Sequence, residues 1–426
     1  MGEGTRREMG TLKITQIETI RVGEFPDLIF VQIHTDGGVI GLGETWYAAS
    51  TVEVAIHDHF GPLLIGRDPA EIEAHWQTMF RLSDHAGYGG AEVRAISALD
   101  IALWDIKGKI TKLPIYEMLG GAVRTKIRVY NTCGVYGEID DGWAIYRDAG
   151  EVAKSLLGEG ITGMKHSPTD YIARDTDGQL VHNGDLDWSL TPIRQIRDAV
   201  GNEISVATDA HAKWNLPSAI KIARAFEPYD PMWHEELLSP FNEVAHLRLQ
   251  ESTKTPIAIA ERLVSRYQHR RFIENGAARI VMPDLEWTGG ISEVHKIAVL
   301  ASAHQLPIAP HDCLGPVNMF ACAQICMSSQ NVMIMEYNRA MAKGWYGRFV
   351  TPDVPVTDGY LHAPEAAGVG CELRTEVRDR SDVTIRLSDE RQEAWLTSRK
   401  RYTYPPPDIQ EMLDKRRAGA SQAEQE

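Results

Sequence analysis

The chain has 426 residues, of which 43% are hydrophobic and 24% are charged, and its formal net charge is −15. This composition is typical of a globular protein with more than one domain, and the acidic balance disfavours nucleic acid and anionic membranes as partners. The hydrophobic runs are strand-sized, the first residues lack the apolar core of a signal peptide, and the five cysteines form no CxxC pair. We therefore expect a cytoplasmic protein.

Residues 1–126 are predicted to form an α+β domain. Two strands are expected at 28–35 and 39–44, joined by the turn Asp36-Gly-Gly, because Gly and Asp tolerate positive φ. A helix is expected at 93–110, where apolar residues recur at steps of three and four and form one buried stripe.

From residue 127 to 350 the pattern predicts a modified, TIM-like (β/α) barrel. Short β-rich runs alternate with helical segments, and the runs lie at 127–131, 161–165, 204–209, 232–235, 256–261, 278–284, 307–311 and 332–336. The polar residues that end the later runs recur at steps of 23 to 27 residues, which is about one strand, helix and two loops: Asp209, Glu235, Glu261, Asp284, His311 and Glu336. Barrel enzymes carry their chemistry at these strand ends.

The segment after the barrel has weaker patterns. Residues 351–404 contain short strand and turn signals, such as Asp358-Gly-Tyr-Leu, and are expected to return to the first domain and complete it. Residues 405–426 begin with Pro405-Pro-Pro and are predicted to be a polar, mobile tail.

Asp209, Glu235 and Glu261 follow adjacent predicted strands and are expected to meet at the barrel mouth. Three crowded carboxylates cannot all stay ionised unless a cation compensates them. Ligation by oxygen alone suits a hard ion, so the sequence predicts one Mg²⁺ per subunit, with Mn²⁺ as the alternative.

Two imidazoles lie near this predicted metal site. His311 and Asp284 end consecutive strands, and a carboxylate beside an imidazole makes a capable general base. His211 comes two residues after Asp209 and so points to the same side of the strand.

Lys165 is a candidate for neutralising a substrate carboxylate or enolate oxygen. Glu336 is a candidate hydrogen-bond donor to an enolate, provided that its neighbours raise its pKa. Together these groups suit removal of a proton beside a carboxylate.

At these residues the chain resembles the mandelate racemase subgroup of the enolase superfamily, and most of all its galactonate-dehydratase-type sugar-acid dehydratases. The resemblance covers about residues 12 to 375. Its motifs are Ala95-Ile-Ser-Ala-Leu-Asp-Ile-Ala-Leu-Trp-Asp-Ile-Lys-Gly-Lys, Leu119-Gly-Gly, Asp209-Ala-His, Trp233-His-Glu-Glu, Ile257-Ala-Ile-Ala-Glu-Arg, Met282-Pro-Asp-Leu and Ala309-Pro-His-Asp-Cys-Leu-Gly-Pro.

The resemblance implies a capping domain on a barrel and dehydration of a sugar acid to a 2-keto-3-deoxy acid. The metal would hold the substrate carboxylate, and His311, paired with Asp284, would take the α-proton. His211 would be the acid that helps the β-hydroxyl leave, and Glu336 would hydrogen-bond the enolate. Capping-domain side chains would choose the substrate, and the candidates are Trp46, Tyr47, His85 and Tyr88.

The chain departs from the family at several positions. Racemases of the subgroup carry Lys-x-Lys on the second strand, and here only Lys165 of that pair is present, followed by His166. This one-sided arrangement favours elimination. Leu237 replaces a usual Pro and Ala260 a usual Gly beside two predicted ligands.

Two alternative functions remain: a racemase or epimerase with His311 opposed by His166 or Lys165, and an inactive barrel with a binding role. We also expect the protein to assemble with copies of itself.

Overall fold

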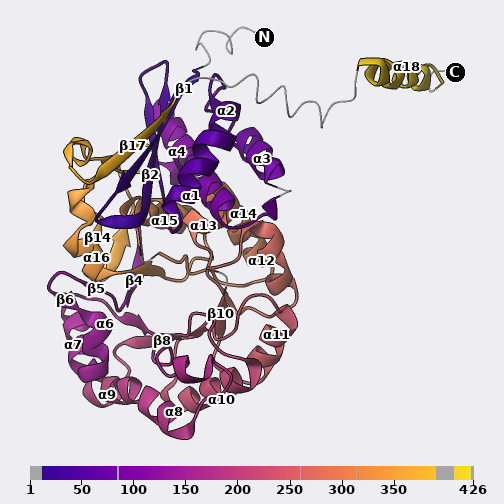
Figure 1. The fold of residues 1–426 in the computed structure, drawn as a ribbon. Coiled ribbons are helices and arrows are strands. Elements are labelled where there is room, and N and C mark those ends of the chain that lie inside the picture. The colour runs from indigo at the N-terminus through magenta and orange to yellow at the C-terminus, as the bar shows by residue number, and fades with distance from the viewer. Residues whose placement is uncertain (1–11, 84–85, 260, 313, 390–406, 424–426) are drawn as a thin grey trace.

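A computed structural model describes residues 12–83, 86–259, 261–312, 314–389 and 407–423 of the chain. An N-terminal capping domain lies on a barrel-like α/β domain, as the sequence predicts, and Figure 1 shows the barrel helices in an arc around the parallel strands. Within these residues, every helix is too short or too polar to cross a membrane.

The capping domain combines one antiparallel sheet with helices that cover it. Strands β1, β2 and β3 follow one another in the sheet, and β17 pairs with the other edge of β1. The elements are β1 Ile14–Val22, β2 Phe25–Thr35, β3 Ile40–Trp46, α1 Ala49–Val54, a π-helical turn η1 Ala55–Phe60, α2 Gly61–Leu64, α3 Ile72–Leu82, α4 Ala91–Thr111 and α5 Ile115–Met118.

Helix α4 packs closely on β3, and two glycines make this possible. A Cβ on Gly41 would lie 2.1 Å from the Ala102 carbonyl oxygen, and one on Gly43 would lie 2.0 Å from that of Ala98. Any larger residue would push the helix away from the strand. The close contact carries the end of β3, with Glu44, to the barrel mouth.

The barrel is built from parallel strands with helices outside them. The strand order is β11-β10-β9-β8-β7-β4, and β12 pairs in parallel with the other side of β4. The strands are β4 Lys126–Thr132, β7 Gly163–His166, β8 Ser205–Asp209, β9 His234–Glu235, β10 Ile257–Ile259, β11 Ile280–Val281 and β12 Met335–Tyr337. The helices are α6 Asp141–Arg147, α7 Ala149–Gly158, α8 Asn183–Ser189, α9 Thr191–Val200, α10 Leu216–Phe226, α11 Glu243–Glu251, α12 Ser265–Glu274, α13 Leu285–Thr288, α14 Gly290–Ala303, α15 Pro316–Ser328 and α16 Arg339–Gly344. A small hairpin, β5 Val135–Tyr136 and β6 Ile139–Asp140, follows β4.

The seventh predicted strand, at 307–311, is less regular than expected. Ile308 forms isolated parallel bridges to Val281 and Val332, which link β11 to the chain leading into β12 and close the ring. Pro307 and Pro310 have no N–H group, so a continuous ladder cannot form there.

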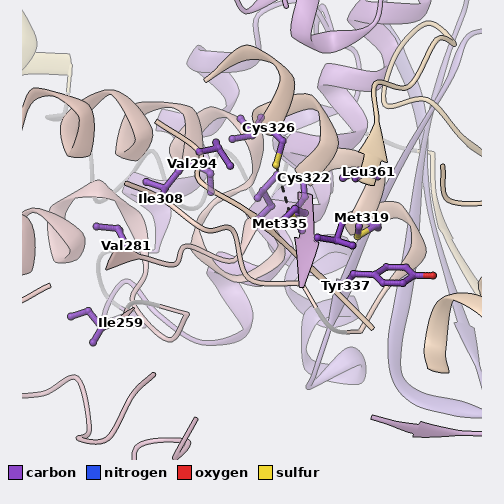
Figure 2. Packing of buried hydrophobic residues seen from close by; sticks show 14 of the residues in the cluster. Ile259, Val281, Val294, Ile308, Met319, Cys322, Cys326, Met335, Tyr337 and Leu361 are labelled. Carbon is purple, nitrogen blue, oxygen red and sulfur yellow. Dashed lines mark hydrogen bonds between the residues drawn. The ribbon is translucent and has the colours of Figure 1, made fainter. Parts of the chain in front are cut away.

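The barrel core is densely packed. Figure 2 shows residues from β10, β11, β12, α14 and α15 in one cluster, with Cys326 Sγ 3.6 Å from Met335 Sδ. A second cluster takes residues from successive strands and from the positions beside them, including Ala207 of β8, Trp233 just before β9 and Ala258 of β10. Because side chains alternate along a strand, Ala207 and Trp233 lie on the same side as Asp209 and Glu235, two residues further on. The cluster therefore forms the floor beneath these carboxylates.

The C-terminal strands divide between the two domains. They are β13 Val350–Thr351, β14 Val356–Thr357, β15 Tyr360–His362, β16 Glu372–Leu373 and β17 Val383–Ser388. β15 pairs antiparallel with β4, and β17 completes the capping sheet. Within the predicted polar tail the structure has a helix, α18 Pro407–Ala423, supported by a 2.8 Å Lys415–Glu411 ion pair. The domain boundaries given above remain predictions.

Candidate active site

The three predicted metal ligands meet at the barrel mouth. Asp209 ends β8, Glu235 ends β9 and Glu261 lies two residues beyond β10. Each side chain offers one oxygen, these oxygens lie within 4.8 Å of one another, and all three residues are buried. The pKa of Glu261 is raised to about 8, chiefly by burial and also by the neighbouring Asp209 and Glu235, against the lowering effect of His311. The group therefore carries more negative charge than the protein alone stabilises.

Lys165 of β7 is the buried cation beside these carboxylates. Its Nζ lies 2.6 Å from Glu235 Oε1, 2.8 Å from Glu336 Oε1 and 4.0 Å from Asp209 Oδ2. Burial alone would lower the pKa of Lys165, but Glu235 and Glu336 raise it well above the usual range. Lys165 is thus held as an ammonium group.

Glu336 of β12 lies on the other side of this ammonium. Its Oε2 accepts a hydrogen bond from the Asp312 N–H at 3.0 Å, and Thr132 donates to Oε1. Burial by itself would raise the pKa of Glu336, but Lys165 and His311 outweigh burial and lower it. Lys165 and His311 therefore hold Glu336 as a carboxylate, and a hydrogen bond from Glu336 to an enolate stays a prediction.

His311 is oriented by Asp284 from one side. Its Nδ1 lies 2.7 Å from Asp284 Oδ2, and its Nε2 lies 3.3 Å from Glu261 Oε2. Asp284 caps the short helix α13, because its Oδ1 accepts from the Glu286 and Trp287 N–H groups at 2.7 and 3.1 Å. With Nδ1–H donated to Asp284, Nε2 is the ring nitrogen that faces the carboxylate group.

His211 is oriented in the same manner by a residue that the sequence analysis missed. Its Nδ1 lies 2.7 Å from Asp170 Oδ2, and its Nε2 lies 3.2 Å from Asp209 Oδ2. Lys213 also donates to Asp170 Oδ2. His211 has a φ of 46°, so the chain turns sharply after β8 and returns the imidazole over the strand end. Asp209 and the Asp170 hydrogen bond raise the pKa of His211, against the effect of burial.

The capping-domain candidates are not placed alike. Trp46 packs into the core with Phe25 and Trp345, each at a ring distance of 6.0 Å. Tyr47 is 43% exposed, and its ring lies 5.5 Å from that of Trp287, which in turn lies 5.0 Å from the His311 ring. Tyr47 is therefore one ring removed from the imidazole.

Tyr88 lies in a different environment, and His85 lies outside the described residues. The Tyr88 ring is 4.9 Å from that of Phe80 on α3, and both line a cavity of about 530 Å³ with Tyr267 of α12. None of the three metal-ligand candidates lines that cavity. Substrate contact by Trp46, Tyr47, His85 and Tyr88 stays a prediction.

Of the two family departures beside the ligands, one can be described. Leu237 is buried, its carbonyl oxygen accepts a hydrogen bond from Trp214 N at 3.2 Å, and the neighbouring Glu235 still reaches the carboxylate group. Ala260 lies outside the described residues.

A second set of buried carboxyls lies behind the His311–Asp284 pair and was not foreseen. Glu44 Oε1 accepts from the N–H groups of Val317 and Asn318 at the start of α15, both at 3.1 Å. The Glu286 carboxyl lies beside that of Glu44, because a Cβ on Gly315 would lie 2.0 Å from Glu44 Oε1 and 3.0 Å from Glu286 Oε1. A proton on one of the two carboxyls removes the repulsion between them. Burial raises the pKa of Glu44 to about 7 and that of Glu286 well above its usual range. The pair joins β3 of the capping domain to α13 of the barrel.

Comparison with known proteins places this geometry in a family. Residues 15–120 match the mandelate racemase / muconate lactonizing enzyme N-terminal domain, and residues 148–377 match the enolase C-terminal domain-like family. The chain belongs to the mandelate racemase subgroup of the enolase superfamily.

Relatives within this superfamily include proteins named as dehydratases. A D-galactonate dehydratase of Variovorax paradoxus is 36% identical over 86% of this chain and 93% of the relative, and one of Ralstonia pickettii is 34% identical over 85% and 92%. A solved enolase of the mandelate racemase subgroup from Agrobacterium tumefaciens is 41% identical, with a TM-score of 0.82 over 88% of this chain and 99% of that one. The protein is thus an enolase-superfamily enzyme of dehydratase-like type.

The residues present fit a divalent cation. The donor set of Asp209, Glu235 and Glu261 is oxygen alone and it is buried. Its negative charge is compensated only in part by Lys165, 2.6 Å from Glu235 Oε1, and by Arg262, 2.6 Å from Glu261 Oε1. These features suit a hard ion and are typical of the superfamily's metal site.

Proposed function

We propose that the protein is a Mg²⁺-dependent dehydratase of a sugar acid, an aldonate of galactonate type. One observation carries the proposal: the buried carboxylate group is flanked by two imidazoles, and each is held by a carboxylate of its own. His311 pairs with Asp284 and approaches Glu261, whereas His211 pairs with Asp170 and approaches Asp209. Elimination of water needs one general base and one general acid at two different positions beside the substrate, and His311 and His211 provide these two positions.

In this proposal one Mg²⁺, held by Asp209, Glu235 and Glu261, supplies charge stabilisation for the substrate carboxylate. His311 accepts the proton from C2 at Nε2, while Asp284 holds Nδ1–H and stabilises the imidazolium. His211 donates a proton from Nε2 to the C3 hydroxyl, which leaves as water with its bonding electrons. The C2–C3 double bond forms, and the enol then takes a solvent proton at C3 to give the 2-keto-3-deoxy acid. Lys165 places a fixed positive charge beside the developing enolate.

The racemase alternative receives less support from these contacts. A racemase needs a second base, but Lys165 is held as an ammonium between Glu235 and Glu336. Burial lowers the pKa of His166 to about 4, and no carboxylate orients its ring among the described residues. Elimination instead uses His311 and His211, the two imidazoles that Asp284 and Asp170 orient.

The experiment is incubation of the Mg²⁺-loaded protein in D₂O with a panel of aldonates, followed by NMR of the products. We expect a 2-keto-3-deoxy acid that carries one deuteron at C3, and a loss of about 10²-fold to 10⁴-fold in kcat for His311→Asn. Exchange at C2 without loss of water would identify a racemase instead. If the metal binds and no aldonate loses water, the proposal is wrong.

A further inference from the structure

A cavity of about 440 Å³ adjoins the site on the His211 side. It lies between α6 and the loops that follow β4, β7 and β8, and its walls include His166, His211, Trp143, Tyr171, Arg174 and Lys213. His211 belongs to both places, because its Nε2 lies 3.2 Å from the metal-ligand candidate Asp209. The cavity is therefore one imidazole away from the carboxylate group.

Polar atoms in the cavity wall lack partners. His166 is 4% exposed, and neither of its ring nitrogens has a hydrogen-bond partner among the described residues. Asp170, also in the wall, uses Oδ2 for His211 and Lys213, whereas its buried Oδ1 has no partner there either. Leaving buried polar groups unpaired is costly. These three atoms have almost no accessible surface in the cavity as it stands, so a ligand pairs with them only after the His166 ring or the Asp170 carboxylate turns towards it.

The remaining wall suits a carbon chain with hydroxyl groups. Trp143 is 47% exposed, and its ring lies 5.6 Å from that of Tyr171, which carries Arg174 at 4.9 Å over its face. Aromatic faces accept the C–H groups of such a chain, and Arg174 and His166 offer hydrogen-bond donors to its oxygens. The carboxylate of Asp170 accepts from a hydroxyl but repels an anion.

We infer that this cavity binds the hydroxylated chain of the substrate beyond C3, and that His166 and Arg174 determine how long a chain is accepted. The inference rests on the proposed function, in which the C3 hydroxyl lies at His211, so that C4 and later carbons lie beside the cavity. Chain-length specificity then depends on the barrel loop after β7 in addition to any contribution from the capping residues.

The test compares aldonates of four, five and six carbons that share the configuration at C2 and C3. Binding is measured by calorimetry in the Mg²⁺-loaded His311→Asn background, which leaves the acid intact, and kcat/KM is measured in the protein with His311 present. We expect the six-carbon acid to bind about tenfold more tightly than the four-carbon acid. Arg174→Met should reduce this ratio by about threefold to tenfold and leave the four-carbon acid unchanged. Arg147→Met is the matched control, because Arg147 is on α6 but pairs with Asp140 at 2.7 Å and does not line the cavity.

A second variant, His166→Leu, separates ligand binding from a structural role. Because the imidazole is buried without partners, Leu should keep or raise the Tm while it weakens binding of the six-carbon acid. A lower Tm with unchanged chain-length dependence would show that His166 is structural and would overturn its assignment.

The outcomes distinguish the two proposals. Turnover that is independent of chain length, or an equal loss for all acids in Arg174→Met, would overturn the cavity assignment while the dehydratase stands. Binding that depends on chain length without turnover of any acid would refute the dehydratase and retain the cavity. Tighter binding of an acid with a second, terminal carboxylate would contradict a neutral chain in the cavity.

Discussion

The Glu44–Glu286 pair makes stability depend on pH, and Glu44→Gln tests this. Gln is nearly the same size, its oxygen can still accept from Val317 and Asn318, and it stays neutral at every pH. Burial raises the pKa of Glu44 from its ordinary value of 4.5 to about 7. At about 1.4 kcal/mol per pKa unit, this difference corresponds to about 3 kcal/mol.

The sign follows from proton uptake. Between pH 4.5 and about 7 the unfolded chain has lost the Glu44 proton while the folded protein keeps it, so the folded state loses stability as pH rises through this range. Above about pH 7 the loss is complete, and below pH 4.5 it is absent. The variant should therefore match the parent protein near pH 4.5 and be more stable by about 3 kcal/mol at pH 8.

The assay is thermal and urea unfolding of both proteins from pH 4.5 to 8. Glu18→Gln is a control of opposite sign, because His34 and Arg378 outweigh burial and lower the pKa of Glu18 to about 2. Its stabilisation is present above pH 4.5 and is lost as pH falls towards 2, so this variant should be less stable at pH 7. If Glu44→Gln and the parent protein lose stability in parallel as pH rises, the reasoning about the buried pair is refuted.

Three further predictions concern the carboxylate group and its neighbours. Glu235→Gln should weaken Mg²⁺ binding at least about tenfold by calorimetry, since it removes a charged ligand; unchanged affinity would place the ion elsewhere. His211→Asn should lower dehydration about 10²-fold to 10⁴-fold while exchange at C2, followed by NMR in D₂O, continues, because His311 acts first; joint loss of both would contradict separate roles. Lys165→Met should destabilise the metal-free protein by about 3–5 kcal/mol, because Glu235 and Glu336 then stay buried without their cation, and Mg²⁺ should raise its Tm more than that of the parent protein. An equal rise in both proteins would argue against Lys165 as the compensating charge.

The sequence predicted the barrel and the meeting of the three carboxylates because both follow from a regular repeat. Strand ends in a parallel barrel lie at one mouth, so a recurring spacing of acidic residues translates directly into proximity. Asp170 has no such signal, since it lies in an irregular loop 41 residues before its partner His211. The Glu44–Glu286 contact joins positions 242 residues apart across two domains, and periodicity within one segment carries no information about it.

Details of local geometry have little signal in the sequence. The raised pKa required of Glu336 could not be judged without the position of Lys165, which lowers it. Adjacent residues on a strand point to opposite sides, so His166 and Lys165 do not both enter one pocket. The His166 side chain lines a separate cavity, and His211 is part of the wall of the same cavity. The positions of these side chains depend on loop conformation, which is set by tertiary packing and is not encoded in the hydrophobic pattern of the sequence.

The pairing of β17 with β1 has a consequence for biosynthesis. β1 emerges from the ribosome about 360 residues before its outer neighbour at Val383–Ser388. Until then β1 exposes a row of unpaired backbone groups on which a strand from another chain can add. A polypeptide that stops before Val383 keeps that open edge permanently, so we expect prematurely terminated chains to aggregate even when their barrel is whole.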